Sequence, residues 1–269
     1  MKKNERGQAL LIVVLVMVVA LTVGLSVASR SITNLKTSTE EANSQNALAA
    51  AEAGVEQAIK SNSNVSELSF NNNTASYDTT ITSVNGKDIL LYGGNPVLQD
   101  DGIDTWLSDY STDPSKIYLN PWPLGGGTEN LTIKWGVSPD PCSNAAIEFA
   151  LIYGTKQSPQ VKRYVFDPCS TRAVINHFSP PTLTGKSTTS GKDFYYEATV
   201  PISLGLIGRV VPLYANTPVA LVAQTTALPS QGSIVTSVGI SGGTQRKVNV
   251  FQGYPEVPSE YFLNILLSL

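Results

Sequence analysis

The chain has 269 residues, a net charge of −3, and only 14% charged residues. Its length allows one membrane anchor with a domain of about 200 residues, or with two smaller domains. Lys and Arg do not cluster beyond the first six residues, so the chain lacks the electrostatic footprint of a nucleic-acid-binding protein. Abundant Gly, Pro, Thr, Ser and Asn favour an extracellular β-rich domain over a cytosolic enzyme.

Three basic residues and Gly7 precede an uncharged, mostly apolar run from Gln8 to Ser29. Twenty apolar residues rise about 30 Å as a helix, which is enough to cross a bilayer. Because the positive charges precede the run, we expect the amino terminus in the cytoplasm and the chain after Ser29 outside. The alternatives are an uncleaved single-pass anchor and a signal peptide cut near Ala28, although signal-peptide apolar cores are usually shorter.

Residues 30–60 are expected to continue this helix as an amphipathic segment outside the membrane. Apolar residues recur at helical spacings, and charged residues fill the other faces. The alanine-rich end has high helix propensity and small side chains that let another backbone approach closely. A continuous helix from Gln8 to Ile59 would be about 80 Å long, with Gly24 as its weakest interior position. The apolar positions are Ile32, Leu35, Ala42, Ala49, Val55 and Ile59.

Three segments, in this order, carry a resemblance to a known family: Glu5 to Leu10 (ERGQAL), Leu21 to Leu25 (LTVGL) and Ala49 to Val55 (AAAEAGV). Residues 5–59, about a fifth of the chain, resemble the N-terminal segment of PilX-type minor pilins, which are type IV pilus assembly proteins. The resemblance implies that prepilin peptidase cuts after Gly7. Residues 1–7 would then be the leader peptide, residues 8–29 the transmembrane part of the helix, and Gln8 the first mature residue.

Ile12 marks a difference from major pilins. They usually carry Glu as the fifth mature residue, where it pairs with the amino terminus of a neighbouring subunit, and that position is Ile12 here. A carboxylate among apolar helices is costly unless paired, and a chain with Ile12 cannot offer that contact. The resemblance therefore implies a minor, priming or tip subunit. Its partners would be other pilins, prepilin peptidase and the inner-membrane assembly machinery.

This resemblance also implies a location. The chain would lie in the bacterial cytoplasmic membrane with an extracytoplasmic head, and on the pilus or cell surface after assembly. Its main rival is a single-pass membrane-anchored surface protein whose β-domain binds a ligand without any filament. Leader cleavage separates the two, because only the pilin requires it.

Beyond residue 60 the pattern changes to short alternating runs separated by turn signals, which predicts an α+β fold with a β-rich domain over 70–269. We expect a sheet wrapped partly around the end of the long helix. The Gly-, Asp- and Pro-rich stretch 93–128 is too long for a simple connection, so we expect it to cross over the sheet. A short helix is expected from Ser259 to Leu269. The expected strands are 75–84, 129–137, 145–154, 160–167, 193–200, 208–214, 217–225, 233–240 and 244–252.

Cys142 and Cys169 lie in two copies of the tetrapeptide Asp-Pro-Cys-Ser. If 131–137, 145–154 and 161–167 form an antiparallel meander, both Cys lie at one end of the sheet, on strands about 10 Å apart. The turns would have to fold over the middle strand to form a disulfide, whose loop of about 27 residues would contribute roughly 3–4 kcal/mol. The alternative is metal binding or thiol catalysis, but no His, third Cys or C-x-x-C motif accompanies the pair. By analogy, the pair resembles the one that closes the variable region of many pilins.

No motif in the sequence predicts an enzyme, a cofactor or a metal site. The only histidine, His177, is far from any candidate nucleophile, and no Ser lies in a G-x-S-x-G elbow. Asp100, Asp101 and Asp104 miss the spacing of a calcium loop, and the glycines 125–127 lack the Lys-Ser/Thr of a phosphate loop. A secreted hydrolase is therefore the weakest of the alternatives.

Overall fold

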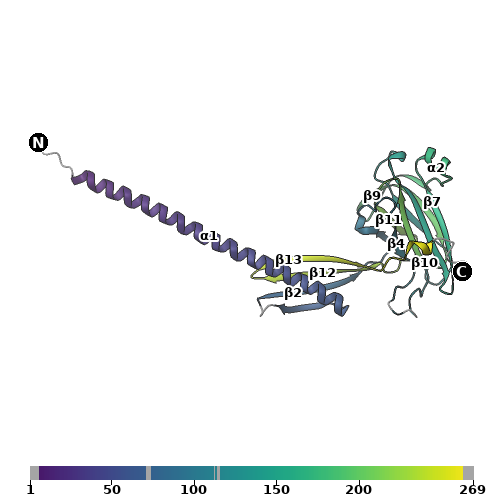
Figure 1. Cartoon of the computed structure of the whole chain (residues 1–269), viewed down its shortest axis with the longest axis horizontal. Coiled ribbons are helices and arrows are strands. Elements are labelled where there is room, and N and C mark those ends of the chain that lie inside the picture. The colour runs from purple at the N-terminus through teal and green to yellow at the C-terminus, as the bar shows by residue number, and fades with distance from the viewer. Residues whose placement is uncertain (1–5, 71–73, 112, 114–115, 263–269) are drawn as a thin grey trace. The chain divides into compact units, whose positions relative to one another are not determined.

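The computed structural model describes residues 6–70, 74–111, 113 and 116–262 (Figure 1). One long N-terminal helix precedes a β-rich region, in agreement with the predicted α+β class. The chain forms two compact units, which we name the helix unit (Met1–Ile81 and Val235–Val250) and the head unit (Thr82–Ile234 and Phe251–Leu269). Of the helix expected at the C-terminus, a 3-10 turn, η3 (Ser259–Phe262), is present, and 263–269 lie outside the described residues.

Helix α1 (Arg6–Ser61) has 56 residues, runs without a break through Gly24 and is about 84 Å long. Lys60 lies in its last turn, where a positive charge complements the helix dipole. Asn62 follows in a left-handed conformation, with φ 48°, which ends the helix.

The second half of α1 packs on a four-stranded sheet with the order β1-β2-β12-β13. The strands are β1 (Val65–Phe70), β2 (Ala75–Ser83), β12 (Gly232–Ser241) and β13 (Thr244–Gly253). A Cβ on Gly239 of β12 would lie 1.9 Å from the carbonyl oxygen of Ala47, so only glycine permits this approach. Small side chains dominate the buried stripe of the helix, which consists of Ala47, Ala50, Ala51, Gly54, Val55 and Ala58.

This stripe is not the apolar face that the sequence pattern marked. Of those six positions only Val55 is buried, whereas Ile32 and Leu35 are each 67% exposed. The reason is steric, since a large side chain between helix and sheet would hold the two backbones apart. Contact at this distance selects for small residues over strongly apolar ones.

Two antiparallel sheets form the head unit, with the orders β4-β10-β6-β7 and β3-β11-β5-β9-β8. Side chains from both sheets share one core, which includes Trp135 on β5, Phe149 on β6 and Val200 on β9. Every second residue of β9 is buried, as the two-residue period of a strand requires. The strands are β3 (Asp88–Leu90), β4 (Ile103–Trp106), β5 (Glu129–Trp135), β6 (Ala146–Thr155), β7 (Ser158–Phe166), β8 (Leu183–Thr189), β9 (Lys192–Ile202), β10 (Gly205–Leu213) and β11 (Val219–Ala223).

The antiparallel meander considered for 131–137, 145–154 and 161–167 does not form. Strands β6 and β7 do pair as a hairpin, but β5 pairs with β9 and β11 in the other sheet. Gly136, with φ 83°, follows β5, and the chain then passes through a 3-10 turn, η2 (Pro141–Ser143), into the first sheet. An alternating strand buries one face whether the next strand pairs with it in the same sheet or lies in the sheet packed against it. The alternation of residues therefore does not show which strands share a sheet.

Part of the stretch 93–128 lies over the sheet, as expected. It contributes β4 and aromatic residues that pack on the face of β6 and β10 opposite the main core. Strands β1, β3, β4 and β8 and the helix α2 (Ser170–Asn176) were not predicted, because they are short or lack clear alternation. The second cluster consists of Trp106, Ala150, Ile207 and Phe262, with Tyr110, Ile117, Tyr118, Ile152, Tyr254 and Val257 packed against it.

Candidate functional site

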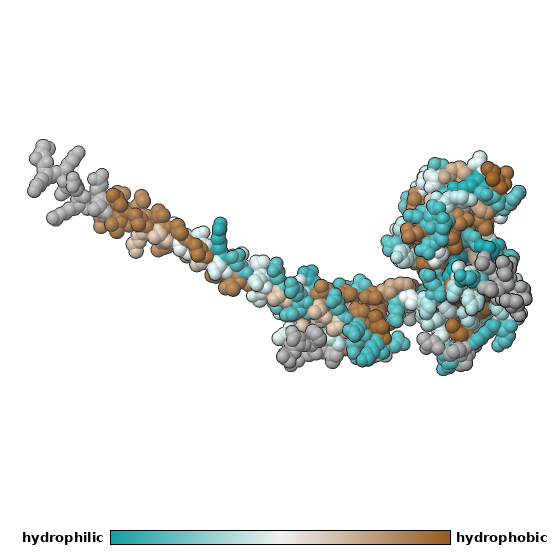
Figure 2. All heavy atoms as spheres, in the orientation of Figure 1, coloured by the Kyte–Doolittle hydropathy of each residue, from teal (hydrophilic) through white to brown (hydrophobic). Residues whose placement is uncertain are grey.

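The first half of α1 exposes a continuous apolar surface, which Figure 2 shows in brown. Every large apolar side chain from Leu10 to Val27 is between 53% and 69% exposed. No charged residue interrupts the stretch from Gln8 to Ser29, and the helix is long and apolar enough to cross a membrane. Soluble monomeric proteins rarely expose apolar patches of more than a few hundred Å². This surface is therefore compatible with a membrane anchor.

The residues predicted to act in processing and assembly lie at the start of this surface. Gly7 and Gln8 follow Arg6, the first residue of α1, and Ile12 lies about one turn further along and is exposed. No acidic residue occurs between Arg6 and Glu40. This part of the helix therefore offers no carboxylate to a cation within an apolar environment. The roles of Gly7, Gln8 and Ile12 stay predictions.

A disulfide joins Cys142 and Cys169, the pairing expected from the sequence, with Cα atoms 4.5 Å apart. In both tetrapeptides the Cys backbone N–H donates to the Asp two residues earlier, Asp140 at 3.2 Å and Asp167 at 2.8 Å. The repeat thus forms the same Asx turn twice. The bond does not pass over the middle strand of a meander. It joins η2, on the crossing between the sheets, to the residue before α2.

Arg172 on α2 strengthens the same region. It donates to both carboxylate oxygens of Asp167, at 2.6 and 2.8 Å, and its guanidinium lies 4.3 Å from the ring centroid of Tyr214. The hydrogen bond to Asp167 raises the pKa of Arg172, so the guanidinium keeps its positive charge. The contacts hold a short helix from which two aliphatic side chains, Val174 and Ile175, project into solvent.

The other residues considered as catalytic, calcium-binding or phosphate-binding candidates have roles in the fold instead. His177 caps the C-terminus of α2 with φ 56°. Asp104 accepts hydrogen bonds from the Arg209 side chain and from the backbone N–H of Val257, each at 2.6 Å, and is not grouped with Asp100 and Asp101 around a cation. The glycines 125–127 all have positive φ and no neighbour that a Cβ would meet within 4 Å, which is typical of an open turn.

Glu129, at the start of β5, is a third buried carboxylate. It accepts hydrogen bonds from the backbone N–H of Thr226 at 2.7 Å and from that of Thr225. Burial by itself would raise the pKa of Glu129, but the hydrogen bonds from the Thr226 hydroxyl and these two N–H groups outweigh it and lower the pKa. Each of the carboxylates of Glu129, Asp104 and Asp167 is thus engaged by donors of the protein itself.

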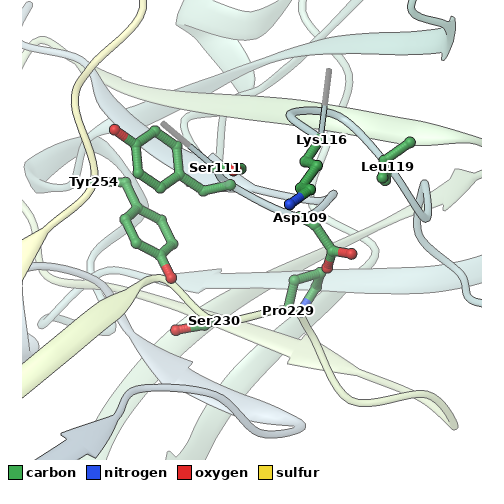
Figure 3. Close-up of a pocket in the computed structure, with 8 residues that line it drawn as sticks. Asp109, Ser111, Lys116, Leu119, Pro229, Ser230 and Tyr254 are labelled. Atoms are coloured by element: carbon green, nitrogen blue, oxygen red, sulfur yellow. The ribbon is translucent and has the colours of Figure 1, made fainter. Parts of the chain in front are cut away.

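A shallow depression of about 340 Å³ lies in the head unit (Figure 3). Tyr110 and Tyr254 stack on one side of it, with ring centroids 4.3 Å apart. Asp109 already accepts a hydrogen bond from Asn120 at 2.6 Å, and Lys116 forms an ion pair at 3.6 Å with the carboxylate three residues before it. Because its charged groups are paired internally, the described residues around this depression show no arrangement directed at a ligand.

Sequence reasoning missed the contact between helix and sheet. Its signal is the series Ala47, Ala50, Ala51, Gly54 and Ala58, in which small residues recur at helical spacing. The ion pair between Asp167 and Arg172 has no periodic signal, because it depends on the turn that the disulfide closes.

Within the residues that the structure describes, no group of three or more His, Cys, Asp or Glu is placed to hold a metal ion. Comparisons of this chain with protein-family models, with curated proteins and with solved structures found no match. Its function is therefore inferred from its own residues and their geometry.

Proposed function

We propose that this chain is a minor pilin-like subunit, processed after Gly7 and assembled through α1 into a type IV pilus or a related filament. The observation that supports this proposal most is that the two halves of α1 have different surroundings. The first half presents an uncharged apolar surface, and the second half packs on the chain's own sheet. A simple anchor needs only about 20 residues to span a bilayer, whereas α1 continues unbroken for a further 32 residues after Ser29.

Assembly follows from the physics of the apolar half. Both lipid and a bundle of apolar helices keep this surface out of water, so the helix can pass from one to the other without exposing it. With Ile12 in place of a carboxylate, no charge has to be desolvated on the way. The same substitution removes the contact with a neighbour's amino terminus, which favours a priming or tip position. In this proposal the partners are other pilins, prepilin peptidase and the inner-membrane assembly machinery.

The N-terminal mass of the native protein tests the proposal. We expect a mature chain beginning at Gln8 in a fraction sheared from the cell surface, and a pool of the same chain in membranes. An intact chain confined to membranes would contradict the proposal and support the single-pass anchor with a ligand-binding β-domain.

Gly7→Leu sharpens this test. We expect the variant to keep its leader, to stay in the membrane and to vanish from the sheared fraction, because the peptidase cuts after a glycine. Gly24→Ala is the matched control, since a Cβ at Gly24 meets nothing within 4 Å. The control should be processed and sheared like the native chain.

A further inference from the structure

One Asn-Gly dipeptide, Asn85-Gly86, lies in the short connection between β2 and β3, within the head unit. The sequence contains this dipeptide only once. Asparagine is chemically labile, because the backbone nitrogen of the following residue can attack its side-chain carbonyl carbon and close a succinimide ring. Glycine in the following position has no Cβ to hinder that attack. The dipeptide therefore combines the residue that reacts with the neighbour that hinders the reaction least.

The side chain of Asn85 is free to rotate into the reactive orientation. It is exposed, and no described residue forms a hydrogen bond with it. Asn64 in the helix unit provides a contrast, because its Oδ1 accepts a hydrogen bond from the backbone N–H of Ile81 at 2.8 Å. A side-chain amide held in this way has to break that bond before it can rotate. Asn85 has no such bond to break.

The backbone nitrogen of Gly86 is likewise available among the described residues. Gly86 lies opposite Leu228 in an isolated antiparallel bridge, and the N–H of Leu228 donates to the carbonyl of Gly86 at 2.8 Å. The return contact, from the N–H of Gly86, does not reach hydrogen-bond geometry. A Cβ added to Gly86 would come no closer than 3.9 Å to the atoms around it. The surroundings of the attacking atom are therefore open.

We propose that Asn85-Gly86 is a site of spontaneous deamidation in the folded chain, which converts Asn85 to a mixture of aspartate and isoaspartate. The Gly86 nitrogen gives up its proton and forms a bond to Cγ of Asn85, and the Cγ–Nδ2 bond breaks to release ammonia. Water then opens the succinimide. Opening at Cγ gives aspartate, and opening at the main-chain carbonyl gives isoaspartate. The reaction needs no co-reactant other than water, and it is independent of the assembly role of α1.

The isoaspartate product loosens this connection. It inserts one methylene group into the main chain between Val84 and Gly86, whose carbonyls accept from the N–H groups of Gln231 and Leu228, each at 2.8 Å. The distance between these two acceptors is set by the standard length of the main chain. A longer main chain cannot keep both bonds at that distance, so at least one of them weakens. The aspartate product adds the same charge but no length.

Incubation of the full chain in lipid nanodiscs, at neutral and at mildly alkaline pH, tests the proposal. Trypsin then releases residues 61–87, a fragment that contains both Asn85 and Asn64. Mass spectrometry with electron-transfer fragmentation distinguishes isoaspartate from aspartate at each position. Digestion in heavy-oxygen water marks any deamidation that occurs during the digest itself.

The expected result is that Asn85 deamidates at a rate that rises with pH, because the attacking nitrogen has to lose its proton. Asn64, which is hydrogen-bonded and followed by Val65, should stay intact over the same period and is the internal reference. Asn85→Gln should abolish the reaction and leave the fold unchanged, since the side chain that it replaces is exposed and without a partner. An Asn85 as stable as Asn64 would overturn the proposal. So would a reaction that is detected only after the chain is unfolded in urea, because the folded geometry would then protect the site.

Hydrogen exchange tests the consequence for the fold. In the isoaspartate fraction, the amide of Gln231 or that of Leu228 should exchange about fivefold faster than in the native chain, the factor of one lost backbone hydrogen bond. Asn85→Asp is the matched control, because it adds the charge without the methylene group, and it should keep the native protection. Native protection in the isoaspartate fraction would refute the loosening of this connection.

Discussion

The helix unit and the head unit bury their residues by different means. In the helix unit, α1 meets the sheet through small residues such as Gly54 and Gly239, and large side chains are few. The head unit fills its core with large rings, among them the fully buried Trp122, Trp135 and Phe149, and contains both cysteines of the chain. Close backbone contact stabilises the first unit, whereas a large core with a covalent link stabilises the second.

This difference separates the two units spectroscopically as well as energetically. All three tryptophans belong to the head unit. Helix α1 has 56 residues and α2 has seven, so α1 contains most of the α-helical residues. Tryptophan fluorescence therefore reports on the head unit, and ellipticity at about 222 nm reports on α1. Denaturation of the full chain in detergent, followed by both probes, can test each unit by itself.

The largest effect is expected from loss of the disulfide. Replacing Cys142 and Cys169 with Ala frees a loop of 27 residues, which should lower the free energy of unfolding of the head unit by about 3–4 kcal/mol. The fluorescence transition should move to lower urea while the ellipticity of α1 is retained. Dithiothreitol should reproduce the shift in the native chain, and an equal shift of both probes would contradict independent stabilisation.

A side chain at Gly239 should produce the opposite pattern. In Gly239→Val the Cβ would overlap the carbonyl oxygen of Ala47, at 1.9 Å, so the helix has to move away from β12. We expect a cost of about 3 kcal/mol in the helix unit, read as faster amide hydrogen exchange over 43–58 with unchanged fluorescence. Ile240→Val, at the neighbouring and exposed position, is the control. Protection of 43–58 as in the native chain would refute the close contact.

The same substitution, Gly to Ala, should destabilise one half of α1 and stabilise the other. In Gly54→Ala the new Cβ would lie 2.3 Å from the Ser237 hydroxyl and 2.6 Å from that of Thr79, which should cost about 1–2 kcal/mol. Gly24→Ala meets nothing and should stabilise the helix by up to about 1 kcal/mol. Hydrogen exchange along α1 measures both, and the same sign at both positions would remove the distinction between the halves.

The smallest effect concerns the pH dependence of the head unit. The lowered pKa of Glu129 means that its stabilisation is complete above the pKa of the unfolded chain and is lost as the pH falls through the folded pKa. Glu129→Gln should therefore cost about 1 kcal/mol at neutral pH, and the difference from the native chain should shrink in acid. Fluorescence-detected urea titrations at several pH values measure it, with the exposed Glu260→Gln as control. A constant difference across this range would exclude the charge as the cause.

The positions of most strands in the head unit were predictable from the sequence, but their arrangement into sheets was not. The nine predicted strands, such as 129–137 and 145–154, all correspond to observed strands, because alternation is a local signal. Which strands share a sheet was not predictable. The crossing after β5 depends on packing between Trp135 and residues far along the chain, and no local pattern encodes it.

The candidate sites were likewise predictable from the sequence only in part. The exposed apolar half of α1 was evident from an uncharged run, since composition alone decides whether a helix can enter lipid. The shallow depression beside Tyr110 was not evident, because its lining comes from residues 109–119 and from Pro229, Ser230 and Tyr254, far along the chain.

By itself the sequence determined a long helix able to cross a membrane, a β-rich remainder and a bond between two cysteines. Each of these depends on local composition, local period or the presence of a single possible partner. Tertiary structure alone decided which face of α1 packs and how the chain changes sheets after β5. These depend on which distant backbones can approach each other, a property set by the size of side chains such as those of Gly54 and Gly239 in three dimensions.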